Sequence, residues 1–219
     1  MAALFKDRQE AGRKLAARLR RFAHEPGLIV LGLPRGGMPV AAEVARTLAA
    51  PLEVFVVRKL GVPGHRELAM GAIASGGLLV LNSEVIEMLG ISERAIAATA
   101  AEETVELERR EREYRGARPF PDLRGATVIL VDDGVATGST MMAGVTALRR
   151  LQPATIVVAA PVMSRQAKAS LSSSADACEC LSAPEPFYGV GVWYDDFSQT
   201  SDAEVRNLLD GEAAHAPRT

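Results

Sequence analysis

The chain has 219 residues, 48% of them apolar, and a formal net charge of −2 at pH 7. This length and composition predict a single domain over residues 1–219 with a sizeable core, and the charge balance excludes the electrostatic footprint of a nucleic-acid-binding protein. No apolar run reaches the roughly 18 residues of a membrane span, and the charged N-terminus has no apolar signal segment. We therefore expect a cytoplasmic protein without membrane or nucleic-acid partners, whose two cysteines are buried and reduced.

Apolar periodicity predicts alternating helices and strands in the first half of the chain. The expected elements are a helix over 5–23, a strand over 28–33, a helix over 38–49 and a strand over 52–57. The segment 59–66 is rich in glycine, proline and charge and is expected to be a loop. Strands over 70–75 and 78–81 are expected to form a hairpin around Gly76-Gly77, before a long charged helix over 92–115.

The second half continues this alternation. The pattern predicts strands over 127–131, 155–160 and 177–181, helices over 141–151, 164–171 and 202–209, an irregular stretch over 182–199, and disorder after Gly211. Repeated strand–helix–strand units predict an α/β fold with a mostly parallel sheet flanked by helices, whose core covers about 24–182. Ligands in such folds bind beyond the carboxyl ends of the strands.

One of these strand ends carries the most informative residues of the chain. The apolar run 128–131 leads into Asp132 and Asp133, and a glycine- and hydroxyl-rich loop over 136–140 precedes a helix. Two adjacent carboxylates can accept hydrogen bonds from a sugar diol. The start of a helix attracts anions, because its amides are unpaired and its dipole is positive there. A diol site beside a phosphate site predicts a ribose 5-phosphate ligand.

Other interpretations of this motif are weaker. A nucleoside-triphosphate P-loop would need a Gly-Lys-Ser/Thr sequence, a receiver-like signalling domain would carry its acids near its start, and glycine-rich turns occur in many α/β proteins. The order of strand, paired acids and Thr-Gly-Ser-Thr loop resembles the phosphoribosyl-pyrophosphate (PRPP) motif of type I phosphoribosyltransferases. Gly134 departs from that motif, because the family usually has an apolar residue there.

A second anion site is expected where the first strand ends. Arg35 follows this strand, and Gly36 and Gly37 open the next helix. A guanidinium beside helix amides suits an anion, although a tight turn with a surface arginine would give the same pattern. The run resembles the pyrophosphate loop of the family, close to its 6-oxopurine branch, and this resemblance implies a cis peptide between Pro34 and Arg35.

The segment 59–69 is a candidate lid. Arg58 and Lys59 precede a glycine-punctuated stretch that contains His65. Such a stretch is either an exposed, solvated loop or a lid that closes over a polyanion and excludes water. Arg58-Lys59 resembles the pair that starts the flexible loop of orotate and adenine phosphoribosyltransferases, and His65 resembles the loop histidine of the orotate branch. That branch's loop lysine falls at or near Val62, which argues against orotate as the acceptor.

The stretch 183–199 holds half of the aromatic residues of the chain. Such clusters serve packing more often than stacking, but this one resembles the hood of 6-oxopurine phosphoribosyltransferases, in which an aromatic ring stacks on the base. The resemblance implies that Gly191 and Asp195 keep the Gly-x-x-x-Asp run near metal and pyrophosphate, and that Pro186 replaces the base-selecting lysine. The base-binding residues that it implies are Phe187, Tyr188, Trp193 and Tyr194.

The resemblance implies transfer of the 5-phosphoribosyl group of PRPP to a nitrogen of a purine-like base, with release of pyrophosphate. Mg²⁺ is the implied cofactor, held mostly by substrate with weak help from Asp132, Asp133 and Asp195, and dimers are common in the family. Asp132 and Asp133 would orient the ribose hydroxyls. The implied phosphate cradle is Val135, Ala136, Thr137, Gly138, Ser139 and Thr140, and the implied pyrophosphate site is Pro34, Arg35, Gly36 and Gly37. The implied catalytic residues, which would mainly stabilise the leaving pyrophosphate, are Arg35, Arg58, Lys59, His65 and Asp195.

Position 136 leaves the acceptor open. In the 6-oxopurine branch it carries an acid proposed to take a proton from the base, and Ala136 cannot do so. Either the base arrives as an anion, or another group such as Asp195 or Asp196 serves, or the acceptor is not a 6-oxopurine. The alternative to an enzyme of nucleotide metabolism, such as purine salvage, is a non-catalytic PRPP- or nucleotide-sensing regulator on the same fold. The retained lid and hood residues favour the enzyme.

Overall fold

The computed structural model describes residues 3–213, and its centre is a five-stranded sheet with the order β2-β1-β6-β7-β8, in which every neighbouring pair is parallel. Strands β1 and β6 are buried along their whole length. Apolar runs buried on both faces are typical of parallel sheets. The strands of this sheet are β1 Ile29–Gly32, β2 Leu52–Val54, β6 Thr127–Val131, β7 Thr155–Val162 and β8 Ala177–Ser182.

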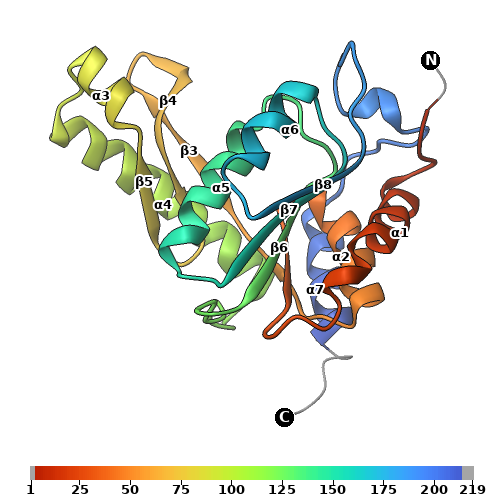
Figure 1. The fold of residues 1–219 in the computed structure, drawn as a ribbon. Helices are drawn as coiled ribbons and strands as arrows, with labels where there is room; N and C mark the ends of the chain where they lie inside the picture. The colour runs from red at the N-terminus through yellow and green to blue at the C-terminus, as the bar shows by residue number, and fades with distance from the viewer. Residues whose placement is uncertain (1–2, 214–219) are drawn as a thin grey trace.

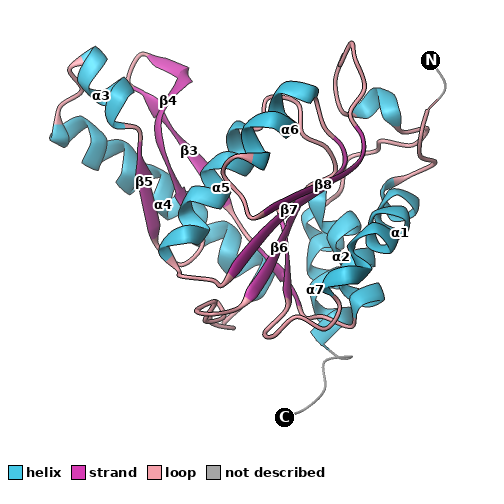
Figure 2. Cartoon of the chain, in the orientation of Figure 1, coloured by secondary structure: helices cyan, strands magenta, loops and turns pink. Residues whose placement is uncertain are grey.

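Helices cover both faces of the sheet, which confirms the expected α/β class (Figures 1 and 2). One face packs against α1 (Arg8–Leu19) and α2 (Gly37–Leu48), and the other packs against α5 (Ser139–Arg150) and α6 (Arg165–Ser172). A 3₁₀ turn, η1 (Arg20–Phe22), continues α1.

A second, antiparallel sheet with the order β3-β4-β5 projects beside the first (Figure 1). It contains the expected hairpin at Gly76-Gly77, where both glycines have positive φ angles of 83° and 71°, as a primed turn requires. The expectation of a loop over 59–66 is wrong. The strands are β3 Val57–Val62, β4 His65–Ala74 and β5 Leu78–Leu81, so most of that segment lies in the β3–β4 hairpin.

The glycine and proline residues of this segment made the hairpin resemble a loop in the sequence. Leu60 and Val62 are buried at alternate positions, as strand residues are. Gly61 lies between them and Gly64 follows them, and glycines at these positions are typical of turns. Gly61 lies at a shift in the strand register, and Gly64 turns the chain with a φ of 82°. Both glycines therefore serve a strand pair rather than a loop.

The strand expected over 52–57 is divided between the two sheets. The Phe55 amide donates to Gly32 O at 2.9 Å, in the parallel sheet. The next amide, that of Val56, donates to Ser75 Oγ at 2.9 Å, beside the antiparallel sheet. Apolar periodicity contains no sign of this break, because both residues are buried.

The remaining helices surround the antiparallel sheet. Helix α4 (Glu93–Arg115) packs on β3 and β4, and α7 (Asp202–Ala213) contacts both α4 and α2. Helix α3 (Ser83–Leu89) was not expected, although Asn82 caps its start and Gly90 ends it with a φ of 59°. Residues 214–219, which form most of the tail expected to be disordered, lie outside the described residues. Over 3–213, no helix combines the length and apolarity that a bilayer crossing requires.

Candidate active site

The paired acids lie at the carboxyl edge of β6, as the sequence predicts. The Asp132 amide donates to Ala159 O of β7 at 3.2 Å, and the Asp133 amide donates to Asp132 Oδ1 at 2.9 Å. Asp132 is half-buried and Asp133 is buried. Burial raises the pKa of both carboxyl groups, and repulsion from Asp133 raises the pKa of Asp132 further. The fold thus holds two acids where their charged forms are disfavoured, as is common at functional sites.

Arg8 of α1 compensates one of these charges. Its Nε donates to Asp133 Oδ2 at 2.8 Å, its Nη1 donates to Ser198 O at 2.7 Å, and its guanidinium carbon lies 3.9 Å from the centre of the Phe197 ring. This ion pair lowers the pKa of Asp133, against the effect of burial. The Tyr194 hydroxyl also donates to the backbone oxygen of Asp133 at 2.6 Å. Asp133 is therefore tied to α1 and to the hood, and Asp132 is the more exposed residue of the pair.

The loop between β1 and α2 packs directly on the two acids. A Cβ on Gly36 would collide with Asp133 Oδ2, and a Cβ on Gly37 would lie 2.8 Å from Val131 O and 2.9 Å from Asp132 Cα. The peptide between Pro34 and Arg35 is cis, as the resemblance implied. The structure therefore brings the expected pyrophosphate loop and the expected diol-binding acids together.

The loop that follows the acids leads into the N-terminus of α5, which begins at Ser139 rather than at Met141. Gly138 precedes the helix with a φ of 79°, and the first helical bond runs from the Met142 amide to Gly138 O at 2.8 Å. The amides before Met142 have no acceptor within the helix. The hydroxyls of Thr137 and Ser139 lie 3.1 Å apart beside these amides. This group of donors can bind a phosphate.

A cavity of about 550 Å³ opens beside this loop. Its walls come from the motif loop, the start of α6 and the hood, and they include Ala136, Ser164, Arg165, Gln166, Glu185 and Phe187. Ser164 joins two of these walls, because its Oγ donates to Ala136 O at 2.6 Å. Phe187 is the residue of the expected base-binding set that lines this cavity.

The other rings expected to bind a base do not line this cavity. Trp193 and Tyr194 are 4% and 5% exposed, and they pack with Phe5, whose ring centre lies 5.4 Å from that of Tyr194. Their burial in this cluster indicates a packing role for Trp193 and Tyr194, and it leaves Phe187 as the ring of the expected base-binding set that faces the cavity. Tyr188 is 69% exposed. The 3₁₀ turn η2 (Gly191–Trp193) lies in this otherwise irregular hood.

Gly134, the departure from the family pattern, has a structural reason. A Cβ at this position would collide with Val190 Cγ1 of the hood and would lie 3.1 Å from Val162 Cγ1 of β7. The hood therefore rests directly on the residue after the acids, which leaves no space for an apolar side chain there.

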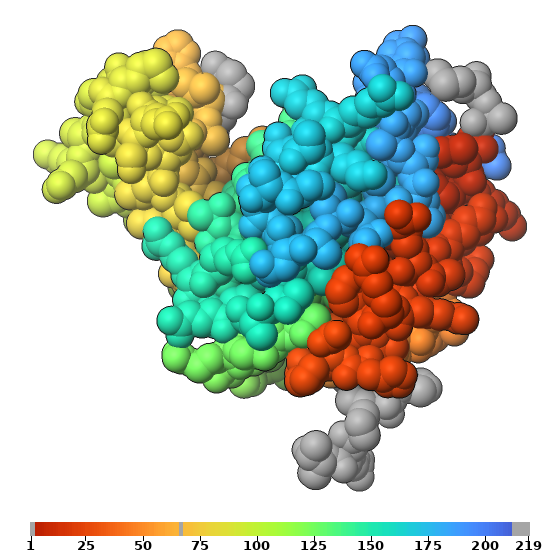
Figure 3. Space-filling view, viewed as in Figure 1, coloured from red at the N-terminus to blue at the C-terminus, as the bar shows by residue number. Residues whose placement is uncertain are grey.

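The remaining cationic residues of the expected site lie on the antiparallel sheet. Arg58 is held by α4, because its Nε donates to Glu103 Oε2 at 2.6 Å. Lys59 and His65 are exposed, and His65 begins β4 at the turn of the β3–β4 hairpin. The space-filling view shows the molecule hollowed between the projecting arm that contains this sheet and the region around α6 (Figure 3). The expected lid is thus a projecting β-hairpin rather than an irregular loop.

The acids provide few ligand oxygens for a metal ion. Asp195 is exposed, and its amide donates to Phe5 O at 2.9 Å. Among the described side chains, no three His, Cys, Asp or Glu residues are grouped so that they could hold a metal. Asp132 and Asp133 are oxygen donors of the kind that Mg²⁺ accepts, and this ion is commonly bound through one or two carboxylates together with substrate phosphate oxygens and waters.

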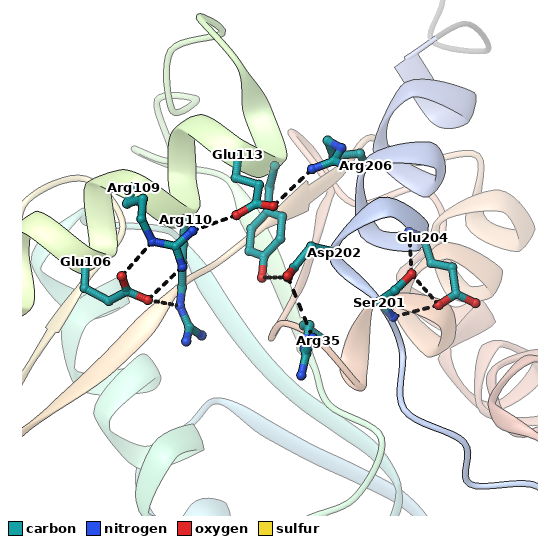
Figure 4. Close-up of polar contacts among 10 residues, drawn as sticks. Arg35, Glu106, Arg109, Arg110, Glu113, Ser201, Asp202, Glu204 and Arg206 are labelled. Atoms are coloured by element: carbon teal, nitrogen blue, oxygen red, sulfur yellow. Dashed lines mark hydrogen bonds and ion pairs between the residues drawn. The ribbon is translucent and has the colours of Figure 1, made fainter.

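Arg35 points from the β1–α2 loop toward the start of α7 (Figure 4). Its Nη1 lies 3.8 Å from Asp202 Oδ2, and the Tyr114 hydroxyl donates to Asp202 Oδ1 at 2.6 Å. Sequence reasoning missed Asp202, Tyr114 and Arg8 as site residues, because none of them belongs to a recognisable motif. The helix expected over 202–209 placed Asp202 in a first helical turn but gave no sign of its contact with Arg35.

Comparisons with known proteins agree with this geometry. The family model for the phosphoribosyl transferase domain matches residues 5–195. The chain is 44% identical over 207 residues to a Mycobacterium tuberculosis protein, found in strains CDC 1551 and H37Rv, whose name assigns it provisionally as a phosphoribosyl transferase. That match covers 94% of this chain and 46% of the relative, so the chain spans about half the length of the curated relatives it matches. The crystal structure of TT1426 from Thermus thermophilus superposes with a TM-score of 0.84 at 40% identity, over 94% of this chain and 97% of that one. The chain therefore belongs to the phosphoribosyltransferase family.

Proposed function

We propose that this domain transfers the 5-phosphoribosyl group of PRPP to a nitrogen of a purine-like base and releases pyrophosphate. The observation that carries the proposal is the direct packing of Gly36 and Gly37 on Asp132 and Asp133. In support, the β1–α2 loop lies against the pair of acids, and the loop that follows these acids leads into the N-terminus of α5. A pyrophosphate, a diol and a phosphate bound there would belong to one molecule, and PRPP carries these three groups.

The two acids have different roles in this proposal. Asp132 accepts hydrogen bonds from the ribose hydroxyls, whereas Asp133, paired with Arg8, holds the surrounding segments in place. Amides and hydroxyls of residues 137–140 bind the 5-phosphate. Arg35 and the amides of Gly36 and Gly37 stabilise the charge that develops on the departing pyrophosphate. A bound Mg²⁺ would supply further neutralisation of that charge, with Asp132 as its candidate protein ligand.

The acceptor base is proposed to bind in the cavity under the hood, against the ring of Phe187. In support, the cavity begins at Ala136 and Thr137, next to the proposed 5-phosphate site. Gln166 and Glu185 offer donors and acceptors to the edge of a base. The β3–β4 hairpin, which carries Lys59 and His65, is proposed to close over the pyrophosphate and exclude water.

A second candidate function is a sensor that binds PRPP or a nucleotide without turnover. Ala136 favours it, because this cavity residue cannot take a proton from a base. Glu185, a carboxylate of the cavity wall, is paired with Arg165 at 2.7 Å, which disfavours its use as a base.

Pyrophosphate release from PRPP and Mg²⁺, measured with a panel of nucleobases and in reactions without base, tests the proposal. Turnover with at least one base, abolished in Asp132→Asn, would support the transferase. Binding of PRPP without turnover on any base would assign the sensor. Failure of the wild-type chain to bind PRPP would contradict both functions.

A further inference from the structure

We propose that Asp202 positions Arg35 for the pyrophosphate group, so that a helix outside the matched family domain completes the anion site. The inference rests on the proposed function. The family match ends at residue 195, whereas α7 begins at Asp202. Asp202 Oδ2 nevertheless lies 3.8 Å from Arg35 Nη1, on the side of the loop that faces α7 (Figure 4).

Asp202 is itself held firmly. The hydroxyl of Tyr114, a residue of α4 that is 3% exposed, donates to Asp202 Oδ1 at 2.6 Å. The backbone before it is fixed by a capping box, in which the Ser201 amide donates to Glu204 Oε2 at 2.7 Å and the Glu204 amide donates to Ser201 Oγ at 3.2 Å. One carboxylate oxygen is therefore occupied by α4, and the other is directed at the arginine.

The helix that carries Asp202 is a rigid support. Val205 and Leu209 of α7 are buried in the same core cluster as Tyr114. Arg206 Nη1 donates to Glu113 Oε1 of α4 at 3.2 Å, and Glu113 also accepts from Arg109, as Figure 4 shows. A side chain anchored in this way can hold a mobile partner in one orientation.

The distance between Arg35 and Asp202 allows Asp202 to orient the guanidinium without occupying its hydrogen-bond donors. At 3.8 Å the two groups attract without a direct hydrogen bond, and the Arg35 side chain keeps 34% of its surface exposed. An ion pair with this exposure contributes little to stability. Its proposed effect is to keep the guanidinium over the β1–α2 loop, where its donors remain available to a phosphate.

The direction of the change in pyrophosphate affinity distinguishes a positioning role of Asp202 from plain charge repulsion between Asp202 and the anion. A carboxylate near an anion site repels the anion, so removal of its charge alone would strengthen pyrophosphate binding. Loss of a positioning group would weaken that binding. Asp202→Asn keeps the size of the side chain and an oxygen that can accept from Tyr114, but it removes the charge that faces Arg35.

The experiment measures the affinities of pyrophosphate, PRPP and ribose 5-phosphate in the presence of Mg²⁺ by calorimetry. Asp202→Asn is expected to weaken pyrophosphate and PRPP binding about fivefold, within the range of couplings between residues in contact. It should leave ribose 5-phosphate binding unchanged, because that ligand does not reach Arg35. Asp210→Asn is the matched control, since it removes the same charge from the same helix at a side chain that is 73% exposed and paired with Arg118. It should leave all three affinities unchanged.

A double-mutant cycle tests whether Asp202 acts through Arg35. In an Arg35→Ala background, Asp202→Asn should cause no further loss of pyrophosphate affinity. An equal loss in both backgrounds, or a gain in affinity in Asp202→Asn, would overturn the inference. Tyr114→Phe leaves the start of α7 intact and should give a smaller loss with the same ligand pattern, and it replaces Asp202→Asn if that variant does not fold.

The two proposals fail in different ways. A wild-type chain that binds neither ribose 5-phosphate nor PRPP would contradict the proposed function and this inference with it. A wild-type chain that binds both, with Asp202→Asn neutral for pyrophosphate, would contradict only the role of Asp202.

Discussion

Arg8 Nε and Asp133 Oδ2 lie 2.8 Å apart, and their side chains are only 11% and 13% exposed. Asp133 is therefore held in a buried ion pair with helix α1. The two acids look equivalent in the sequence, but the structure makes them unequal, because the direct ion pair of Arg8 is with Asp133 and not with Asp132. The proposed division into one ligand-binding acid and one anchoring acid follows from this contact.

Arg8→Met is expected to destabilise the fold, because it leaves the Asp133 carboxylate enclosed without its counter-charge. Breaking a buried pair costs roughly 3–5 kcal/mol, and with the remaining exposure we expect a loss of about 2 kcal/mol. Urea unfolding measures this change. The matched control is Arg13→Met on the same helix, where the arginine is half exposed and lies 3.5 Å from Glu43, with an expected change below about 0.5 kcal/mol. Equal losses in the two variants would contradict the anchoring role.

Asp132→Asn is expected to stabilise the ligand-free protein near neutral pH. Burial and the charge of Asp133 raise the pKa of Asp132 above its ordinary value of 3.8, so the folded state binds more protons than the unfolded chain above that pH. The stability contributed by protonated Asp132 is fully present below pH 3.8 and is lost as the pH rises through the raised pKa of the folded state.

Urea unfolding of both proteins as a function of pH tests this expectation. The advantage of the asparagine variant should grow as the pH rises from about 4 toward 7. A difference that is independent of pH would show that Asp132 titrates in the folded protein as it does in the unfolded chain.

Gly134→Ala is expected to push the hood away from the acids, because the new Cβ meets Val190 Cγ1. Overpacking of this kind costs roughly 1–3 kcal/mol, and base affinity should fall with it. Gly211→Ala in α7 adds a Cβ that meets nothing within 4 Å and should stabilise the helix by roughly 0.5–1 kcal/mol. Val190→Ala should recover part of the loss in the Gly134→Ala background. No recovery would mean that the two residues do not oppose each other.

Phe187→Ala and Trp193→Ala separate binding from packing in the hood. Phe187 lines the cavity, so its truncation should weaken base binding far more than PRPP binding. Trp193 is buried, so its truncation should cost roughly 3–5 kcal/mol of unfolding free energy. Thermal unfolding and base titration of both variants measure these effects. If Trp193→Ala were fully stable and lost only base affinity, its assignment as a packing residue would be wrong.

Parts of the site that are contiguous in the chain could be predicted from the sequence, and parts assembled from distant segments could not. The strand, acids and loop over 127–140 form one motif, so their order predicts their geometry, and the cis peptide after Pro34 followed from the same resemblance. Arg8 is 125 positions away from Asp133, and no local pattern connects them. Asp202 reaches Arg35 only because α7 folds back between α4 and α2.

The local sequence pattern also gave a wrong prediction where glycine lies within a strand pair, because glycine is common in loops as well as in such turns and bulges. Gly61 and Gly64 read as loop residues, although they permit a register shift and a turn inside the β3–β4 hairpin. The aromatic residues of the hood show the same limit. Phe187 and Trp193 lie six positions apart in one cluster, and only their burial shows that one lines a cavity while the other fills the core.

The central claim is that residues 132–140 form the cradle for a phosphorylated pentose, and calorimetric titration of PRPP with Mg²⁺ into the wild-type chain and Asp132→Asn tests it most directly. We predict a dissociation constant in about the micromolar range for the wild type and a loss of at least about tenfold in the variant, which is roughly 1.4 kcal/mol. Equal affinity in the two proteins, or no binding by the wild type, would contradict the claim.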